Sequence, residues 1–439
     1  MKNYGIISAY GLQKNLIASN RIYGLYSQLK RRNNVKLFLP KLKLENDNIN
    51  PFATNDIYFF NTHKCWFFNY IRKKHKRNFR EKSDFFSSDD ISKKGKLVQL
   101  LSILTHNNFI GYNRILNFDD QNIVKLNFNS NFPHLRDLDI LITSAGPAIM
   151  NYFGYKIKKK NPNIFWVADY RDLNQNNPGR VDQFNFRLKK MDKLAFKYAD
   201  LITTVSYGTK EQNIENAKKM GYDIRDRTYV LYNGFSLENN SLELSSKEEL
   251  KSLFVDKDKI YIVYTGSIAP LQKIEYFLKV LTDLQQLKFI YAGNSHQLID
   301  VSVQKFNLED KVINLGFVKK EEAEYLQKKA DILLLLKLID GNKDKGMMTG
   351  KFYEYLTKNK KIMVIGDQDE EFNEICKNLK NVDILPYDKD KIAEYLNNLK
   401  KEDLKEKYDP NIERFSWETL AKDFDDYIEK KLKERNFDK

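Results

Sequence analysis

The stretch from Thr349 to Leu356 combines residue types that could bind a nucleotide. Residues 341–346 carry two glycines and mixed charges, and the run after Thr349 lacks Gly and Pro, so a helix is expected to begin near Thr349. Unpaired N–H groups at a helix start attract anions, and Lys351 adds a positive charge. One turn further along, the Glu354 carboxylate could accept hydrogen bonds from two sugar hydroxyls. The same residues also fit an ordinary amphipathic helix with a solvated glutamate.

A second polar group, Asp169, Arg171 and Asp172, follows the strand-like residues 163–168. Ligands of open α/β sheets collect outside the carboxyl ends of strands. Three charges at one strand end are costly unless they are used or paired. We therefore expect Asp169, Arg171 and Asp172 to orient an acceptor hydroxyl or to stabilise charge. The alternative is a structural ion pair that caps the next helix.

A third candidate is the small loop at Gly266 and Ser267, which follows the strand-like residues 259–265. Lys273 comes just before a helix with apolar residues at helical spacing, so loop and lysine together suit a diphosphate. The loop lacks the Gly-Lys-Ser/Thr run of a Walker motif. Earlier in the chain, Gly11 follows the first strand, and a glycine there lets a ligand approach the backbone.

The elements that position these residues are strands alternating with helices, which is typical of parallel α/β sheets. The alternation breaks at the polar residues 236–258 and then starts afresh, so two doubly wound domains are expected. We assign residues 1–234 to an N-terminal acceptor domain and 235–410 to a C-terminal donor domain. Residues 411–439 are expected to form a helix that packs back on the N-terminal domain.

Composition limits the function classes. The 439 residues are 42% hydrophobic and 30% charged, and no apolar run approaches the roughly 20 residues that cross a bilayer. The two cysteines, Cys65 and Cys376, lie far apart without a metal-binding spacing, which favours a reducing cytoplasm and predicts no metal site. The net charge of +15 fits nucleic acid, an anionic membrane or anionic substrates and does not choose among them.

The segment of about residues 45–130 is an insert that the alternation does not explain. Aromatic residues at 65–71 adjoin basic residues at 72–80. This composition fits an aromatic helix facing the core, a contact with anionic membrane, or single-stranded nucleic acid. Nucleic acid ranks lowest, because the basic residues of the chain are spread out and not gathered in a recognisable binding element.

The order and spacing of these motifs resemble the family 4 glycosyltransferases of bacterial surface-polysaccharide synthesis. The resemblance covers most of the chain, and residues 167–172 resemble the Asp-x-Arg-Asp strand end of the bacterial members. The other segments that carry it are residues 199–206, 231–234, 264–267, 315–318 and 350–356. The resemblance implies an α/β chain with the GT-B architecture, in which two Rossmann-like doubly wound domains face a central cleft.

The resemblance also implies a function. Such enzymes transfer a sugar from a nucleotide-diphosphate sugar with retention of anomeric configuration, without a metal in the chemistry. The acceptor would be a polysaccharide or a lipid-linked saccharide, reached from the N-terminal domain at the inner face of the membrane. Lys273 would contact the donor diphosphate and Glu354 the ribose, and the amides of Thr349 and Gly350 would neutralise phosphate. The residues expected beside the base are Gly293, Asn294, Phe317 and Val318.

Three features depart from the family pattern. Ser267 stands where the family commonly has an arginine, and Gly346 stands in place of the first glutamate of a Glu-x7-Glu motif. Lys343, Lys345 and Lys351 are candidates to replace the lost charge. Arg171 and Asp172 stand where some members place an acceptor-side histidine. These departures leave a second hypothesis, a catalytically weak relative that acts as a binding or regulatory subunit.

Overall fold

The structure is a computed structural model, and it describes residues 1–9, 17–41, 56–64, 124–126, 133–146, 148–174, 185–236, 248–269, 272–338, 346, 348–405 and 407–437. Gly11 and the aromatic and basic residues 65–80 of the predicted insert lie outside these ranges. No helix in the described ranges has the length and apolar character needed to cross a membrane.

The first half of the chain forms an eight-stranded sheet with the order β4-β3-β2-β1-β5-β6-β7-β8. All neighbours are parallel except β3 and β4. The strands are β1 (Asn3–Ile7), β2 (Asn34–Lys41), β3 (Ile57–Lys64), β4 (Val124–Leu126), β5 (Ile140–Ser144), β6 (Phe165–Asp169), β7 (Leu201–Thr204) and β8 (Thr228–Val230). The helices are α1 (Ile17–Lys30), α4 (Ile149–Lys160), α5 (Asn185–Tyr198) and α6 (Tyr207–Lys219).

The second half forms a six-stranded parallel sheet with the order β11-β10-β9-β12-β13-β14. The strands are β9 (Ile260–Thr265), β10 (Leu287–Ala292), β11 (Val312–Asn314), β12 (Ile332–Leu336), β13 (Lys361–Ile365) and β14 (Val382–Leu385). The helices are α7 (Glu248–Lys251), α8 (Ile274–Leu281), α9 (His296–Phe306), α10 (Lys320–Lys329), α11 (Gly350–Leu356), α12 (Glu370–Cys376) and α13 (Lys389–Asn398).

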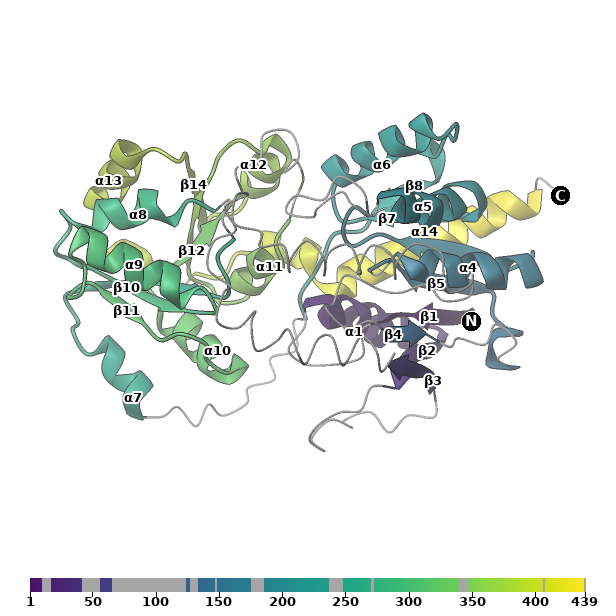
Figure 1. Cartoon of the computed structure of the whole chain (residues 1–439), viewed down its shortest axis with the longest axis horizontal. Helices are drawn as coiled ribbons and strands as arrows, with labels where there is room; N and C mark the ends of the chain where they lie inside the picture. The colour runs from purple at the N-terminus through teal and green to yellow at the C-terminus, as the bar shows by residue number, and fades with distance from the viewer. Residues whose placement is uncertain are drawn as a thin grey trace, which may run out of the picture.

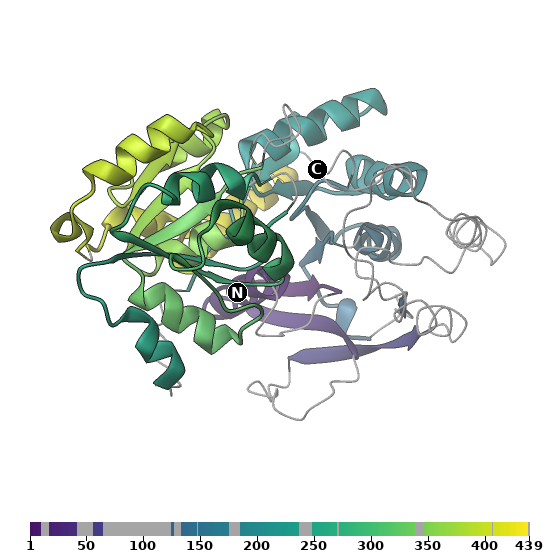
Figure 2. The ribbon, with the colours of Figure 1, turned by 60° about the vertical axis from the view of Figure 1, so that its left-hand side comes forward.

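Each sheet is covered by helices on both faces, so its central strands are apolar without alternation. Every residue of β5, β6, β9 and β12 is buried. In the first sheet, one core contains residues of α4, α5 and α6, and the other contains residues of α1 and of the C-terminal helix. Figures 1 and 2 show the two sheets as separate layered bodies. The predicted α/β class with two doubly wound sheets is confirmed.

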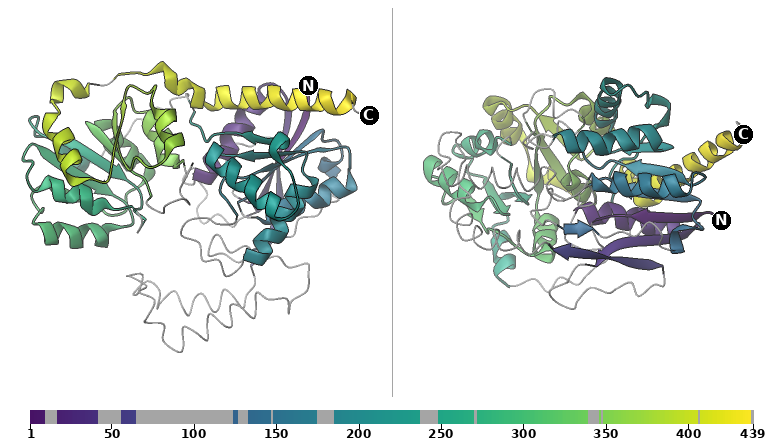
Figure 3. Two further views of the ribbon diagram at one scale, coloured as in Figure 1. Left: turned by 90° about the horizontal axis from the view of Figure 1, so that it is seen from above. Right: turned by 45° about the vertical axis from the view of Figure 1, so that its right-hand side comes forward.

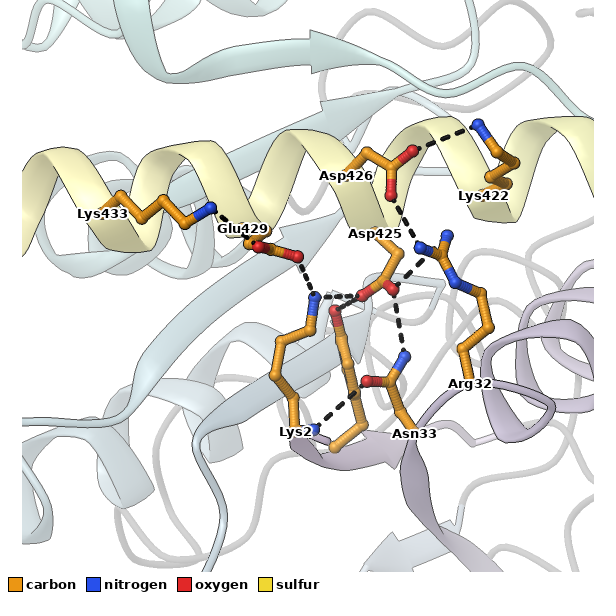
Figure 4. Close-up of polar contacts among 9 residues, drawn as sticks. Lys2, Arg32, Asn33, Lys422, Asp425, Asp426, Glu429 and Lys433 are labelled. Carbon is orange, nitrogen blue, oxygen red and sulfur yellow. Dashed lines mark hydrogen bonds and ion pairs between the residues drawn. The ribbon is translucent and has the colours of Figure 1, made fainter.

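Helix α14 (Trp417–Phe437) returns from the second sheet and lies along the first, as Figure 3 shows. Trp417, Phe424 and Ile428 enter the core beside Tyr4. Asp425 accepts hydrogen bonds from the Tyr4 hydroxyl at 2.6 Å and the Asn33 amide at 3.1 Å, and it pairs with Lys2 at 2.8 Å (Figure 4). The last helix is therefore bonded to the first strand.

Two segments connect the sheets, and they run side by side. The Phe235 N–H donates to the Phe415 carbonyl at 3.1 Å, and the Trp417 N–H donates to the Phe235 carbonyl at 2.9 Å. Arg21 of α1 holds the first segment by donating to the carbonyls of Leu231 and Tyr232 at 3.0 and 3.1 Å. The connection is thus a short paired backbone anchored on α1.

Candidate functional site

The carboxyl edge of the second sheet gathers most of the predicted donor residues. Strand order reverses between β9 and β12, and ligands of doubly wound sheets bind in the crevice outside such a switch point. The loops after β9 and β10 are in direct contact there, since the Gly266 N–H donates to the Ala292 carbonyl at 2.7 Å. A Cβ at Gly293 would lie 2.1 Å from the Gly266 carbonyl oxygen, so the close approach requires glycine.

The Lys351 side chain reaches from α11 to the loop after β9. Its ammonium donates to the Tyr264 hydroxyl at 2.7 Å and to the Ser267 carbonyl at 3.1 Å, and it lies 4.3 Å from the centre of the Tyr264 ring. Gly266 has φ +109°, and a Cβ there would lie 2.5 Å from Lys351 Cε. Gly266 therefore leaves room for the Lys351 side chain, whose ammonium lies beside Ser267.

Burial disfavours the charged form of Lys351. Removal from water lowers the pKa of its ammonium to about 8, although Glu354 opposes the shift. An anionic ligand in this crevice would restore a strong preference for the charged form. An anion bound here would therefore be expected to raise the pKa of the Lys351 ammonium again.

Glu354 is half-buried, and a residue that sequence analysis did not single out holds its carboxylate. Gln327 of α10 donates from Nε2 to Glu354 Oε1 at 2.9 Å and to Thr265 Oγ1 at 2.8 Å. Thr265 is the last residue of β9, so the contact ties α10, α11 and the start of the glycine loop together. Glu354 also lies one helical turn from Lys351, so the edge presents a carboxylate and a cation.

The other predicted donor residues lie around this edge. Thr349 is the N-cap residue of α11, and its Oγ1 is buried without a hydrogen-bond partner in the described part of the chain. Phe317 is 75% exposed. Lys273, Ser267 and Asn294 are exposed, whereas Val318 and Gly350 are half-buried. Lys273 is the N-cap residue of α8 and follows the loop that begins at Gly266.

Gly346 is explained by close approach of the two halves of the molecule. Its φ is +72°, and a Cβ there would lie 2.6 Å from Ser206 Oγ and 2.7 Å from Glu371 Oε2. Its N–H donates to Asp369 at 3.2 Å, and Asp369 pairs with the buried Lys337 at 2.8 Å. A glutamate at position 346 is therefore incompatible with this arrangement.

The three charges at the end of β6 have different environments. Asp169 pairs with Arg21 at 2.6 Å and accepts from Thr203 Oγ1 at 2.7 Å. Burial alone would raise the pKa of Asp169, but Arg21 and Thr203 outweigh it and lower that pKa. The expectation that all three charges serve the site is therefore wrong for Asp169, which forms a structural ion pair.

The remaining two charges lie further toward the edge of the first sheet. Arg171 is half-buried and donates from Nη2 to the Gly146 carbonyl in the loop after β5. Asp172 is exposed. Both follow β6 at the carboxyl edge of the first sheet, which is a different sheet from the one that carries Lys351 and Glu354.

Glu371 of α12 also takes part in the contact between the two halves of the molecule. Its carboxylate accepts hydrogen bonds from the N–H groups of Tyr207 and Gly208, both at 2.7 Å, at the start of α6. Charge-assisted bonds to free N–H groups at a helix start are among the stronger hydrogen bonds. Glu371 thus joins α12 to α6 across the two halves, which Figures 1 and 2 show side by side.

Several solved structures share this arrangement of two doubly wound sheets. Anabaena HepE in complex with UDP aligns with 98% of this chain and 100% of its own at 13% identity and a TM-score of 0.56. Sucrose-phosphate synthase from Thermosynechococcus elongatus aligns with 98% and 99% of the two chains at 11% identity and a TM-score of 0.61. The lipopolysaccharide outer core galactosyltransferase WaaB aligns with 98% and 99% at 14% identity and 0.56.

The chain has the GT-B fold. At this level of identity the likeness shows the fold and does not show which reaction the chain carries out. The sequence matches no family model and no curated protein.

Gln327, Tyr264 and Glu371 are the contributors to this edge that sequence analysis missed. Gln327 lies among charged residues of α10, and a tyrosine at the end of a buried strand looks like a core residue. Glu371 is in an acidic first turn of α12, where it resembles an ordinary helix-start carboxylate. No spacing in the sequence pairs any of them with α11 or α6.

Proposed function

We propose that this chain is a retaining glycosyltransferase of the family 4 type. It would move a sugar from a nucleotide-diphosphate sugar to a polysaccharide or lipid-linked saccharide acceptor. The carrying observation is that Lys351 and Glu354 lie one turn apart at the switch point of the second sheet. A cation and a carboxylate at this spacing suit the diphosphate and the ribose of one nucleotide.

The proposed chemistry needs charge stabilisation more than covalent groups from the protein. The bond from the anomeric carbon to the diphosphate breaks, and a bond to the acceptor oxygen forms on the same face. The acceptor proton leaves with the diphosphate. Lys351, Lys273 and the amides of Thr349 and Gly350 would stabilise the departing negative charge, which lowers the barrier where that charge develops. We propose that no metal takes part.

The acceptor is proposed to enter from the first sheet. Arg171 and Asp172 follow β6 at its carboxyl edge, and they are the candidates to orient the acceptor hydroxyl. The HepE structures include complexes with UDP and with UDP-glucose, which makes uridine donors the first to try.

Transfer assays test the proposal. Purified chain is incubated with nucleotide sugars and saccharide acceptors, and the anomeric configuration of the product is read by NMR. Glu354→Ala and Lys273→Ala should each lower transfer by roughly tenfold or more, because the first removes a charged acceptor for the ribose hydroxyls and the second a cation beside the diphosphate. Lys279→Ala, an exposed lysine further along α8, is the matched control and should keep full activity.

Two results would contradict the proposal. Unchanged transfer by both alanine variants would remove the assigned roles of Glu354 and Lys273. Donor binding without turnover under any condition would favour the second hypothesis of a binding or regulatory subunit.

We also propose a peripheral contact with anionic membrane, through the outer surfaces of α4 and α5. No Asp or Glu occurs in α4, and the one in α5, Asp192, is buried. The rings of Tyr155 and Tyr198 meet there at 4.9 Å. Tyrosines beside lysines suit a headgroup region, where each basic residue near an anionic surface contributes about 1 kcal/mol. The exposed lysines of the two helices are Lys156, Lys159, Lys160, Lys189, Lys190, Lys193 and Lys197.

Vesicle sedimentation tests this contact. The chain should sediment with vesicles containing phosphatidylglycerol and not with pure phosphatidylcholine. Changing Lys156, Lys159, Lys193 and Lys197 to Gln should weaken sedimentation by at least about tenfold. The control changes four exposed lysines of α13 and the segment after it to Gln and should leave sedimentation intact; they are Lys389, Lys391, Lys400 and Lys405. Equal sedimentation of both variants would place the contact elsewhere.

A further inference from the structure

Gln327 is a buried amide in the otherwise apolar contact between α10 and β9. Its side chain is 1% exposed, next to Leu326 and Ala330 in the core. Burying an amide costs free energy unless its polar atoms are hydrogen-bonded. Gln327 uses both protons of Nε2, one on Thr265 Oγ1 at 2.8 Å and one on Glu354 Oε1 at 2.9 Å.

The chemistry of its partners fixes the orientation of this amide. An ionised carboxylate only accepts hydrogen bonds, so the atom of Gln327 that faces Glu354 must be the nitrogen. The amide oxygen is then buried, and it has no hydrogen-bond partner in the described residues. An apolar side chain of the same length would fill the space without that cost, so packing alone does not explain a glutamine here.

What the amide does is hold Glu354. Gln327 engages Oε1 of the carboxylate and restricts its orientation, and no hydrogen bond to Oε2 is found within the described residues. A carboxylate restricted in this way is better preorganised to accept from the neighbouring hydroxyls of a ribose, because less side-chain entropy is lost on binding.

We propose that Gln327 is a positioning residue that sets ribose recognition by holding Glu354. The inference rests on the proposed function, since it takes the ligand of Glu354 to be a nucleotide. Gln327 itself touches no ligand atom. Its effect is therefore expected on the preference for the ribose hydroxyls and not on the rest of the nucleotide.

Calorimetric titration of the full-length chain separates these effects. The probes are the tightest-binding nucleoside diphosphate and its 2′,3′-dideoxy analogue, which lacks both ribose hydroxyls. The wild-type chain should prefer the first. Gln327→Met should weaken binding of the ribonucleotide by roughly tenfold and leave the dideoxy affinity unchanged, because a bond that orders a charged acceptor is lost.

Two further variants keep the test decisive. Gln327→Asn retains a buried amide but is one methylene too short to span both partners, so it should behave like Gln327→Met even if the methionine variant fails to fold. Tyr395→Phe removes a 2.6 Å bond to Asp383 elsewhere in the same domain and should leave the preference intact.

The outcomes distinguish this inference from the proposed function. A Gln327 variant that folds and keeps the wild-type preference overturns the inference, and so does one that weakens both probes equally, which is the mark of a purely structural role. If the wild-type chain binds no nucleoside diphosphate at all, the proposed function itself fails and the inference fails with it.

Discussion

At the scale of single residues, the Lys351 side chain of α11 reaches the loop after β9. Its ammonium donates to the Ser267 carbonyl at 3.1 Å. A lysine differs from an arginine because it can lose its proton in a buried site. If Lys351 binds the donor diphosphate as proposed, donor binding should therefore depend on pH.

Donor affinity should fall as pH rises through about 8. Burial lowers the pKa of Lys351 to about 8 in the free chain, and a bound diphosphate raises it, so the complex binds more protons than the free chain above that pH. Calorimetry between pH 7 and 9 should show up to about a tenfold loss of affinity per pH unit once Lys351 is neutral. Lys351→Arg, which stays charged, should flatten the dependence. An identical dependence in both chains would contradict this role.

At the scale of elements, the alternation of strands and helices was predictable because each strand is a short apolar run with a polar or glycine-rich end. The start of α11 at Gly350, with Thr349 as N-cap residue, was predictable from the loop before it. The residues that contact α11 were not predictable from the sequence, because the packing of α10 and β9 brings Gln327 and Tyr264 to it.

The ion pair at the end of β6 was not predictable from the sequence either. The sequence places Asp169, Arg171 and Asp172 together, but it does not show that Arg21 is buried against the first of them. A charge pair between residues so far apart in the chain follows from the sheet order, in which α1 leads from β1 to β2 and β6 lies two places from β1. Local spacing therefore overestimated the number of site residues.

Loss of the Glu371 carboxylate should weaken the contact of α12 with α6. Glu371→Ala removes two charge-assisted hydrogen bonds between the halves of the molecule, which are worth about 1.5–3 kcal/mol in buried sites and less here, since Tyr207 is exposed. The variant should populate more open arrangements, seen as a larger radius of gyration in small-angle X-ray scattering. Glu374→Ala, on the same helix, should match the wild type, because within the described residues the ion pair of Glu374 is with the exposed Lys377. Equal radii for all three chains would show that Glu371 does not hold the halves together.

At the scale of the whole molecule, two doubly wound sheets are joined by a short paired connection and by a final helix that returns to the first strand. Asp425 accepts hydrogen bonds from Tyr4 and Asn33 and forms an ion pair with Lys2, so the last helix packs against the N-terminal strand (Figure 4). Tyr353 of α11 packs edge-on against Phe415 of the connection, with ring centres 5.6 Å apart. The candidate donor site is thereby in direct contact with the joint between the two halves.

We propose that the carboxyl edge of the second sheet binds a nucleotide-diphosphate sugar through Glu354. Calorimetric titration of the wild-type chain and Glu354→Ala with uridine, guanosine, adenosine and thymidine diphosphate sugars tests this binding. One donor should bind the wild-type chain, and Glu354→Ala should bind that donor roughly tenfold more weakly or worse. Binding of equal strength in both chains, or no binding of any donor to the wild type, would contradict it.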